Sequence, residues 1–158
     1  MKIVVIAVGA AKSPGLAAAI REYEARVSRY FKFEVMEVRG QRITARRSEA
    51  DVIESDSEEL LARVPQGLDV VAVDERGDSW SSEALAAYLS DLAVLGKPGA
   101  AFLIGGAFGL SGDLRRRADR VLSMCSFTLP HELARLVLTE QLYRAGTIQR
   151  GEPYHKGG

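Results

Sequence analysis

The sequence of 158 residues has few of the residue types that build covalent cross-links or metal sites: one cysteine, two histidines and one tryptophan. The single thiol of Cys125 excludes an internal disulfide, and no Cys/His cluster stands at the ligand spacing of a structural zinc site. Twenty-one basic residues balance twenty-one acidic ones, so no global field attracts nucleic acid or an anionic membrane. Any electrostatic binding surface must come from local clusters, and we expect no bound metal.

Long apolar runs are also missing. None approaches the roughly 20 residues that a bilayer-spanning helix needs. The short run at residues 2–8 is β-branched, which favours a buried strand over a signal peptide. We therefore expect a soluble cytoplasmic protein with no membrane partner. A length of 158 residues with 47% apolar content predicts one domain, residues 1–158, with one substantial core.

What the sequence does contain is a regular alternation of strand and helix patterns. Continuous apolar runs predict buried strands, the alternating segment 32–38 predicts a strand at an edge, and Ser13 and Pro14 predict the start of a helix. This order indicates an α/β fold with a mainly parallel sheet and helices on both faces. Strands are expected near 2–8, 32–38, 68–77, 100–106 and 120–129, and the last helix is expected over about 130–145, followed by a polar tail.

The run "FLIGGAFGL", residues 102–110, ends a buried strand in glycines. Glycine is used where another backbone or a ligand approaches too closely for a Cβ, so something is expected to crowd Gly105 and Gly106. The pattern lacks the spacing of a dinucleotide fingerprint and the Gly-Lys-Ser/Thr ending of a P-loop. Tight packing in a turn is the alternative explanation for these two glycines.

Polar groups of possible chemical use gather near the C-terminus. Glu140 and Arg144 are four residues apart on the last helix, where they can pair at the surface. Tyr154 and His155 bring an aromatic ring and an imidazole to the tail, although most tails of this kind are disordered ends. His131, at the helix start, is either structural or faces a substrate.

Two clusters of arginine could hold phosphate groups, or could be ordinary solvated surface. The first is in a loop predicted to be mobile, and the second is on a short helix. Their members are Arg39, Arg42, Arg46, Arg47, Arg115, Arg116 and Arg117.

Several stretches taken in order resemble one family over nearly the whole chain. They are "VDERG", "LIGGAFGLS", "FTLPHELARLVLTEQLYRA" and the terminal "PYHK". The sequence is similar to the bacterial large-subunit ribosomal RNA pseudouridine N3-methyltransferases, the RlmH family of the SPOUT superfamily. The resemblance implies a homodimer with a deep trefoil knot in about residues 70–158. It also implies S-adenosylmethionine as methyl donor and N3 of a pseudouridine in 23S ribosomal RNA, on the assembled ribosome, as acceptor.

The resemblance also implies roles for particular residues. His155 would take or relay the proton, Arg144 and Lys156 would stabilise the imide anion, and Tyr154 would stack on a base while Glu140 orients Arg144. Lys156 stands where the family usually has arginine, and it lacks the planar fork of that residue. The expected cofactor-binding residues are Val73, Gly105, Gly106, Met124, Cys125, Ser126, Phe127, Thr128 and Leu129.

Two other functions remain open at the level of sequence. The altered tail is compatible with an inactive ribosome-binding module of the same fold. A nucleotide-dependent oxidoreductase is the other alternative, although the glycine pattern is misplaced for it.

Overall fold

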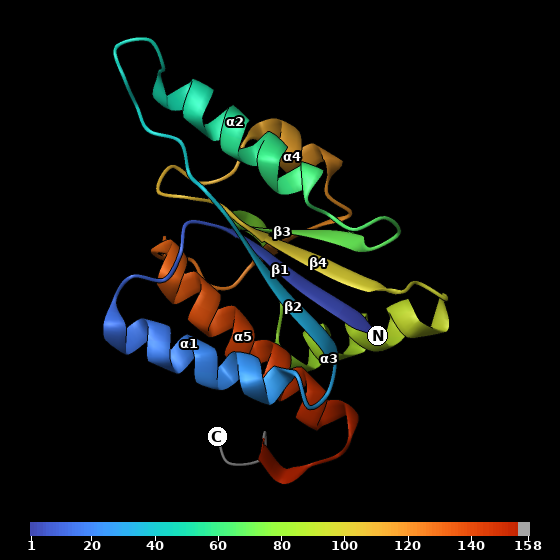
Figure 1. The fold of residues 1–158 in the computed structure, drawn as a ribbon. Coiled ribbons are helices and arrows are strands. Elements are labelled where there is room, and N and C mark those ends of the chain that lie inside the picture. Colours follow the sequence, from blue (N-terminus) through green and yellow to red (C-terminus); the bar gives the residue numbers. More distant parts are fainter. Residues whose placement is uncertain (155–158) are drawn as a thin grey trace.

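The computed structural model describes residues 1–154, which form five strands and five helices in strict alternation (Figure 1). Strand β1 is followed by α1, and the alternation continues to α5, the longest helix. The elements are β1 (Lys2–Val8), α1 (Pro14–Val27), β2 (Lys32–Val38), α2 (Glu49–Ala62), β3 (Asp69–Ser79), α3 (Ser82–Val94), β4 (Gly99–Ile104), α4 (Gly112–Arg117), β5 (Arg120–Ser123) and α5 (His131–Gln149).

The five strands form one parallel sheet in the order β2-β1-β4-β3-β5. The expected α/β class and parallel sheet are confirmed, and β2 lies at an edge as its alternating pattern predicted. In a parallel sheet all the carboxyl ends meet at one edge, and open α/β sheets bind their ligands there.

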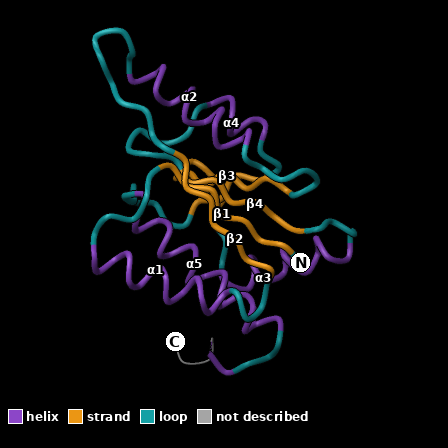
Figure 2. Tube along the Cα trace, viewed as in Figure 1, coloured by secondary structure: helices purple, strands orange, loops and turns teal. Residues whose placement is uncertain are grey.

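Helices cover both faces of this sheet (Figures 1 and 2). Helices α1, α3 and α5 lie on one face, and α2 and α4 lie on the other. Because successive side chains of a strand point to opposite faces, β1 supplies both cores. Its side chains Ile3, Val5 and Ala7 join the first core, and Val4, Ile6 and Val8 join the second.

The helix starts are mostly capped as serine chemistry predicts. Ser48 forms a capping box with Asp51, and Ser81 and Ser111 accept hydrogen bonds from the backbone three residues on. Ser13 is the exception, because its hydroxyl makes no capping bond although Pro14 does occupy the first turn. Instead the backbone N–H groups of Lys12 and Ser13 donate to the carboxylate of Glu132 at the start of α5.

The predicted end of the last helix at residue 145 is wrong. Helix α5 continues through Gln149, and Pro130 is its N-cap. Gly146 lies inside the helix against Tyr30, where a methyl group would be 2.6 Å from the ring atom Cγ. The helix ends at a Schellman cap, in which the N–H groups of Gly151 (φ +66°) and Glu152 donate to the carbonyl oxygens of Ile148 and Thr147. Gly146 is therefore a packing position inside the helix.

Strand β3 is interrupted where it pairs with β5. Val73 and Asp78 both align with Leu122, so residues 74–77 form a bulge that leaves the ladder. Gly77 returns the chain so closely that a methyl group there would be 2.4 Å from the Val121 carbonyl oxygen. The bulge places three charged side chains, Asp74, Glu75 and Arg76, at the carboxyl edge of the sheet.

None of the helices in residues 1–154 is both long and apolar enough to span a bilayer. The trefoil knot in residues 70–158 and the single-domain boundary both stay predictions.

Candidate active site

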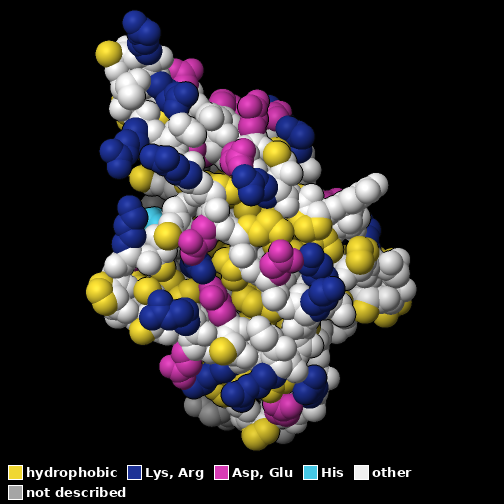
Figure 3. All heavy atoms as spheres, viewed as in Figure 1, with side chains coloured by type: hydrophobic (Ala, Val, Ile, Leu, Met, Phe, Trp, Pro, Cys, Tyr) yellow, Lys and Arg dark blue, Asp and Glu magenta, His cyan; other side chains and the backbone are white. Residues whose placement is uncertain are grey.

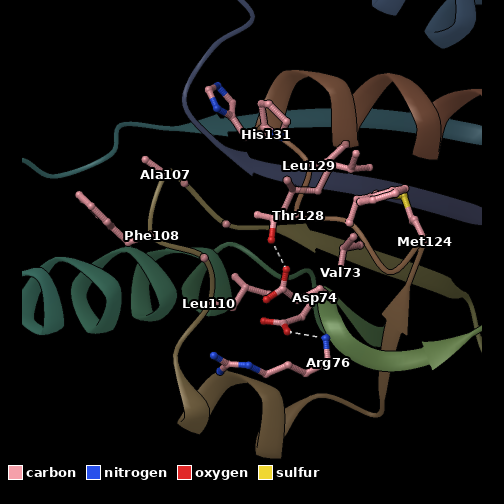
Figure 4. A pocket seen from close by; sticks show the side chains of 18 of the residues that line it. Val73, Asp74, Arg76, Ala107, Phe108, Leu110, Met124, Thr128, Leu129 and His131 are labelled. Carbon is pink, nitrogen blue, oxygen red and sulfur yellow. Dashed lines mark hydrogen bonds between the residues drawn. The ribbon is translucent and has the colours of Figure 1, made fainter.

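A cleft of about 690 Å³ opens at the carboxyl ends of β3, β4 and β5 (Figure 4). Glu49 and Arg115 complete its walls, which come mostly from four segments that are far apart in the sequence. They are the end of β3 with its bulge (73–76), the turn after β4 (104–110), the segment after β5 (124–130) and the first turn of α5. This volume is within the range of roughly 300–1,000 Å³ that small-molecule sites span.

The turn after β4, residues 105–110, is here called the glycine turn. The N–H of Gly109 donates to the Gly106 carbonyl oxygen at 3.1 Å, and Gly109 has a φ of +81°, which favours glycine. A methyl group at Gly105 would lie 2.6 Å from the carbonyl carbon of Gly109, and one at Gly106 would lie 3.0 Å from Val8 Cγ1. The predicted crowding of both glycines is confirmed, and it comes from the turn itself and from β1.

An ion pair joins the bulge to the glycine turn. Arg115 donates from Nη1 to Asp74 Oδ2 at 3.0 Å and to the Leu110 carbonyl oxygen at 2.6 Å. The Asp74 side chain is only 10% exposed, so the pair is shielded from solvent on the carboxylate side. Arg115, one of the three clustered arginines, therefore has a structural partner at the floor of the cleft.

A second bond joins the bulge to the segment after β5. The Thr128 hydroxyl donates to Glu75, and the Arg76 N–H donates to Asp74 Oδ1 at 3.0 Å (Figure 4). The two walls of the cleft are thus linked by side chains of the bulge.

The start of α5 closes the cleft beside the loop after β1. His131 lies against Gly9, and a methyl group at Gly9 would be 3.3 Å from His131 Nε2. Within the described residues this nitrogen is buried without a hydrogen-bond partner. The next residue, Glu132, accepts from the backbone of Lys12, and this bond lowers the pKa of its carboxyl.

Most of the predicted cofactor-binding residues line this one cleft, and Ser126 lies off it. Cys125 donates from its thiol to the Phe127 carbonyl oxygen at 3.4 Å, which helps to shape the segment after β5. The residues on the lining are Val73, Gly105, Gly106, Met124, Cys125, Phe127, Thr128 and Leu129.

The predicted catalytic residues form a separate cluster on α5 and the turn after it. Arg144 donates to Glu140 Oε1 from Nη2 at 2.7 Å and from Nε at 3.1 Å, and the Tyr154 hydroxyl donates to the same oxygen at 3.1 Å. The guanidinium lies 4.9 Å from the centre of the Tyr154 ring. The hydrogen bonds that Arg144 donates to Glu140 raise the pKa of Arg144, while burial raises the pKa of Tyr154.

This cluster is not part of the cleft lining in the same chain. Glu140 is nine residues along α5 from His131, which corresponds to about 13 Å along the helix axis. His155 and Lys156 lie outside the described residues, so their predicted roles stay predictions.

A family model described as "Predicted SPOUT methyltransferase" matches residues 1–155. The chain belongs to the SPOUT methyltransferase family. The resemblance inferred from the motifs is therefore confirmed.

Curated relatives match this chain over nearly the full length of both proteins. A protein of Gemmatimonas aurantiaca named ribosomal RNA large subunit methyltransferase H is 45% identical over 157 residues, which cover 99% of this chain and 100% of the relative. A protein of the same name from Clostridium kluyveri is 40% identical over 159 residues, covering 99% and 100%. Among solved structures, a probable methyltransferase from Bordetella pertussis has a TM-score of 0.54 at 14% identity, covering 90% of this chain and 95% of that one. At that identity the likeness supports the fold alone.

Sequence reasoning missed the charged residues of the bulge and their partners. The charges that follow a buried run in "VDERG" were the available signal, because charge at the carboxyl end of a parallel strand lies where ligands bind. Phe108 was also missed. It is exposed at the tip of the glycine turn and lines the cleft.

Proposed function

We propose that this SPOUT protein is an S-adenosylmethionine-dependent methyltransferase that acts in the cytoplasm on large-subunit ribosomal RNA. The acceptor is N3 of a pseudouridine on the assembled ribosome. The main support is the full-length similarity to curated proteins named ribosomal RNA large subunit methyltransferase H. The cleft at the carboxyl edge of the sheet supports a small-molecule donor.

The residues of the cleft fit such a cofactor. Gly105 and Gly106 keep the floor free of side chains, and the segment 124–129 has no charged residue and offers backbone groups to an adenine ring. Val73 and Leu129 add apolar surface, as expected in a site that is mostly apolar with a few polar groups. When it is bound, S-adenosylmethionine supplies a sulfonium methyl group. Alignment of this methyl group with the acceptor provides much of the acceleration of methyl transfer.

The chain must also prepare the acceptor. An imide nitrogen becomes nucleophilic when it loses its proton, so the site needs a base or a cation that stabilises the anion. Arg144 is held in a fixed orientation by Glu140 and Tyr154, which suits a cation that meets developing negative charge. His155 is the proposed group that takes or relays the proton, since imidazole titrates near neutral pH.

A homodimer would bring the two halves of the site together. Leu133, Val137, Glu140 and Arg144 follow helical spacing along one side of α5, away from its core residues, and all four are only partly buried. This side of α5 combines apolar surface with Glu140 and Arg144, which do not line the cleft of the same chain. We propose that the partner's cluster completes each cleft across this surface.

Two measurements test the proposed function. Calorimetry with S-adenosylmethionine should show binding by the wild type and loss of binding by Gly105→Ala, whose methyl group would meet the backbone of Gly109. The wild type should also transfer labelled methyl to large ribosomal subunits that lack the modification, and Gly105→Ala should not. Ribosome association by the wild type without any methyl transfer would instead identify an inactive binding module.

A further inference from the structure

The glycine turn presents an aromatic side chain to solvent at the mouth of the cleft. Phe108 is 41% exposed, and Phe127 in the segment after β5 is 77% exposed. Within residues 1–154 these are the two exposed aromatic side chains, and both line the cleft. Burying a phenylalanine side chain is favourable, so the exposure of two at one site indicates that something covers them.

A loop with four arginines rises beside the glycine turn. We call residues 39–47 the arginine arm; it projects beyond α2 as a narrow extension of the molecule (Figure 1). The backbone groups of Thr44 and Arg47 exchange two hydrogen bonds, of 3.1 and 3.2 Å, that close its tip. Arg39, Arg42 and Arg46 are exposed, and among the described residues none of the three forms an ion pair.

The base of the arm is fixed to the glycine turn. Methyl groups at Gly40 and Gly106 would lie 2.9 and 3.0 Å from the same Val8 atom, Cγ1, and 3.7 and 3.6 Å from Asp56 Oδ2. Asp56 is 7% exposed and accepts from the Gln41 N–H at 2.9 Å. The base of the arm and the glycine turn therefore leave the core side by side.

The surface view shows the same arrangement. Basic side chains gather over the arm and along the neighbouring edge of the molecule, while acidic side chains lie over the helical layer next to it (Figure 3). The chain has no net charge, so this local excess of cations is a feature of the arm and not of the whole surface.

We infer that the arginine arm and the glycine turn form one binding surface for an unpaired RNA segment. The exposed arginines hold phosphates, and the rings of Phe108 and Phe127 stack on bases that lead into the cleft. Cations beside exposed aromatic rings are the combination that single-stranded nucleic acid requires, because every base has a face for stacking. This inference rests on the proposed function and names the form of RNA that reaches the site. Phe127 is one of the residues that line the cofactor cleft, and its exposed side chain is also available to a base.

The test compares two substitutions at Phe108 in the full-length protein. Phe108→Leu keeps an apolar side chain but removes the ring, whereas Phe108→Tyr keeps the ring. The probe is a fluorescent single-stranded oligouridine of about 12 nucleotides, within the site sizes of such proteins, and anisotropy reports its affinity. Loss of one stacked base weakens binding roughly 5- to 100-fold. We expect Phe108→Leu to show such a loss and Phe108→Tyr to bind like the wild type.

Duplex RNA of the same length separates stacking from charge. Paired bases offer no free face to Phe108, so Phe108→Leu should leave duplex affinity unchanged. The double variant Arg39→Ala/Arg42→Ala should weaken both probes, and it should reduce the slope of log affinity against log salt by about 0.7 per lost contact on the single strand. Arg63→Ala, at the opposite end of α2, and Leu95→Ala, an exposed side chain beyond the amino edge of the sheet, are the matched controls.

Two results would overturn the inference. The first is equal oligouridine affinity for Phe108→Leu and Leu95→Ala. The second is a change of oligomeric state in Phe108→Leu by sedimentation, which would mean that a second copy of the chain covers the rings.

Cofactor binding and methyl transfer by the wild type are measured in parallel, so that failure of this inference can be told apart from failure of the proposed function. If the wild type transfers methyl and Phe108→Leu binds RNA normally, the surface is wrong and the proposed function stands. If the wild type transfers no methyl while RNA affinity still depends on the ring of Phe108, the proposed function is wrong and the RNA-binding surface stands.

Discussion

Glu132 shows how one side chain can fix the geometry of the cleft. Its carboxylate accepts hydrogen bonds from the backbone N–H groups of Lys12 and Ser13, and so ties the loop after β1 to the first turn of α5. A carboxylate in the first turn also complements the helix dipole. The bond from Lys12 lowers the pKa of the carboxyl, which means that the folded state favours the charged form.

The lowered pKa predicts a pH dependence of stability. A carboxyl whose pKa is lower in the folded state stabilises the fold above its unfolded pKa, about 4.3 for glutamate. That contribution is lost as the pH falls through the folded pKa. We expect Glu132→Gln to unfold at a lower urea concentration than the wild type at pH 7, with the difference shrinking as the solution is acidified below the unfolded pKa.

Urea titrations monitored by circular dichroism at several pH values measure this difference. Glu49→Gln is a suitable control, because Glu49 is also an acid in the first turn of a helix but has no backbone partner from another segment among the described hydrogen bonds. A gap between Glu132→Gln and the wild type that stays constant with pH would show that the charge of Glu132 plays no part.

At the scale of elements, the contact between Gly146 and Tyr30 predicts opposite effects for two similar substitutions. Alanine in place of glycine favours a helix by about 1 kcal/mol. Gly146→Ala would still be destabilising, because the new methyl group would lie 2.6–2.9 Å from three atoms of Tyr30. Gly15→Ala in α1 has no atom within 4 Å of the new methyl group, and it should be neutral or slightly stabilising.

Thermal unfolding of both variants checks the pair. Overpacking of this kind costs typically about 1–3 kcal/mol, so Gly146→Ala should lower Tm while Gly15→Ala should leave it unchanged or raise it. If Gly146→Ala raised Tm as much as Gly15→Ala, the close packing of α5 on Tyr30 would be refuted.

Features of the fold that depend on contacts between distant residues could not be predicted from the sequence. The alternation of strands and helices depends on local periodicity and turn chemistry, and its order was predicted correctly, although β5 ends at Ser123 and not at residue 129. The end of α5 is set locally by the glycine cap at Gly151, a signal that the prediction of an end at residue 145 did not use, whereas the bulge of β3 depends on pairing with a strand more than 40 residues later. Patterns within a short window contain no information on such a partner, so the bulge was missed.

Part of the candidate site could likewise be predicted from the sequence, and part could not. Gly105, Gly106 and the uncharged segment 124–129 could be predicted because their composition is unusual by itself. The partnership of Asp74 with Arg115 joins elements that meet only in the folded chain. The sequence also gave no means of seeing that the Glu140 and Arg144 pair stands apart from the cleft.

At the scale of the whole molecule, that separation makes the proposed dimer testable by complementation. Gly105→Ala removes the cleft and keeps the cluster, whereas Arg144→Ala removes the cluster and keeps the cleft. In a site shared between two chains, a mixed dimer has one intact cleft facing one intact cluster. Random exchange makes about half of the dimers mixed, so about one quarter of wild-type activity should return.

The measurement is methyl transfer to large ribosomal subunits before and after the two inactive variants are unfolded together and refolded. Each variant refolded alone is the control for recovery, and Arg144→Ala should bind S-adenosylmethionine like the wild type because Arg144 does not line the cleft. A site completed within one chain would give no activity in any mixture. Recovery therefore requires the partner's cluster to reach the cleft, and its absence from a mixture that sedimentation shows to be dimeric would refute the shared site.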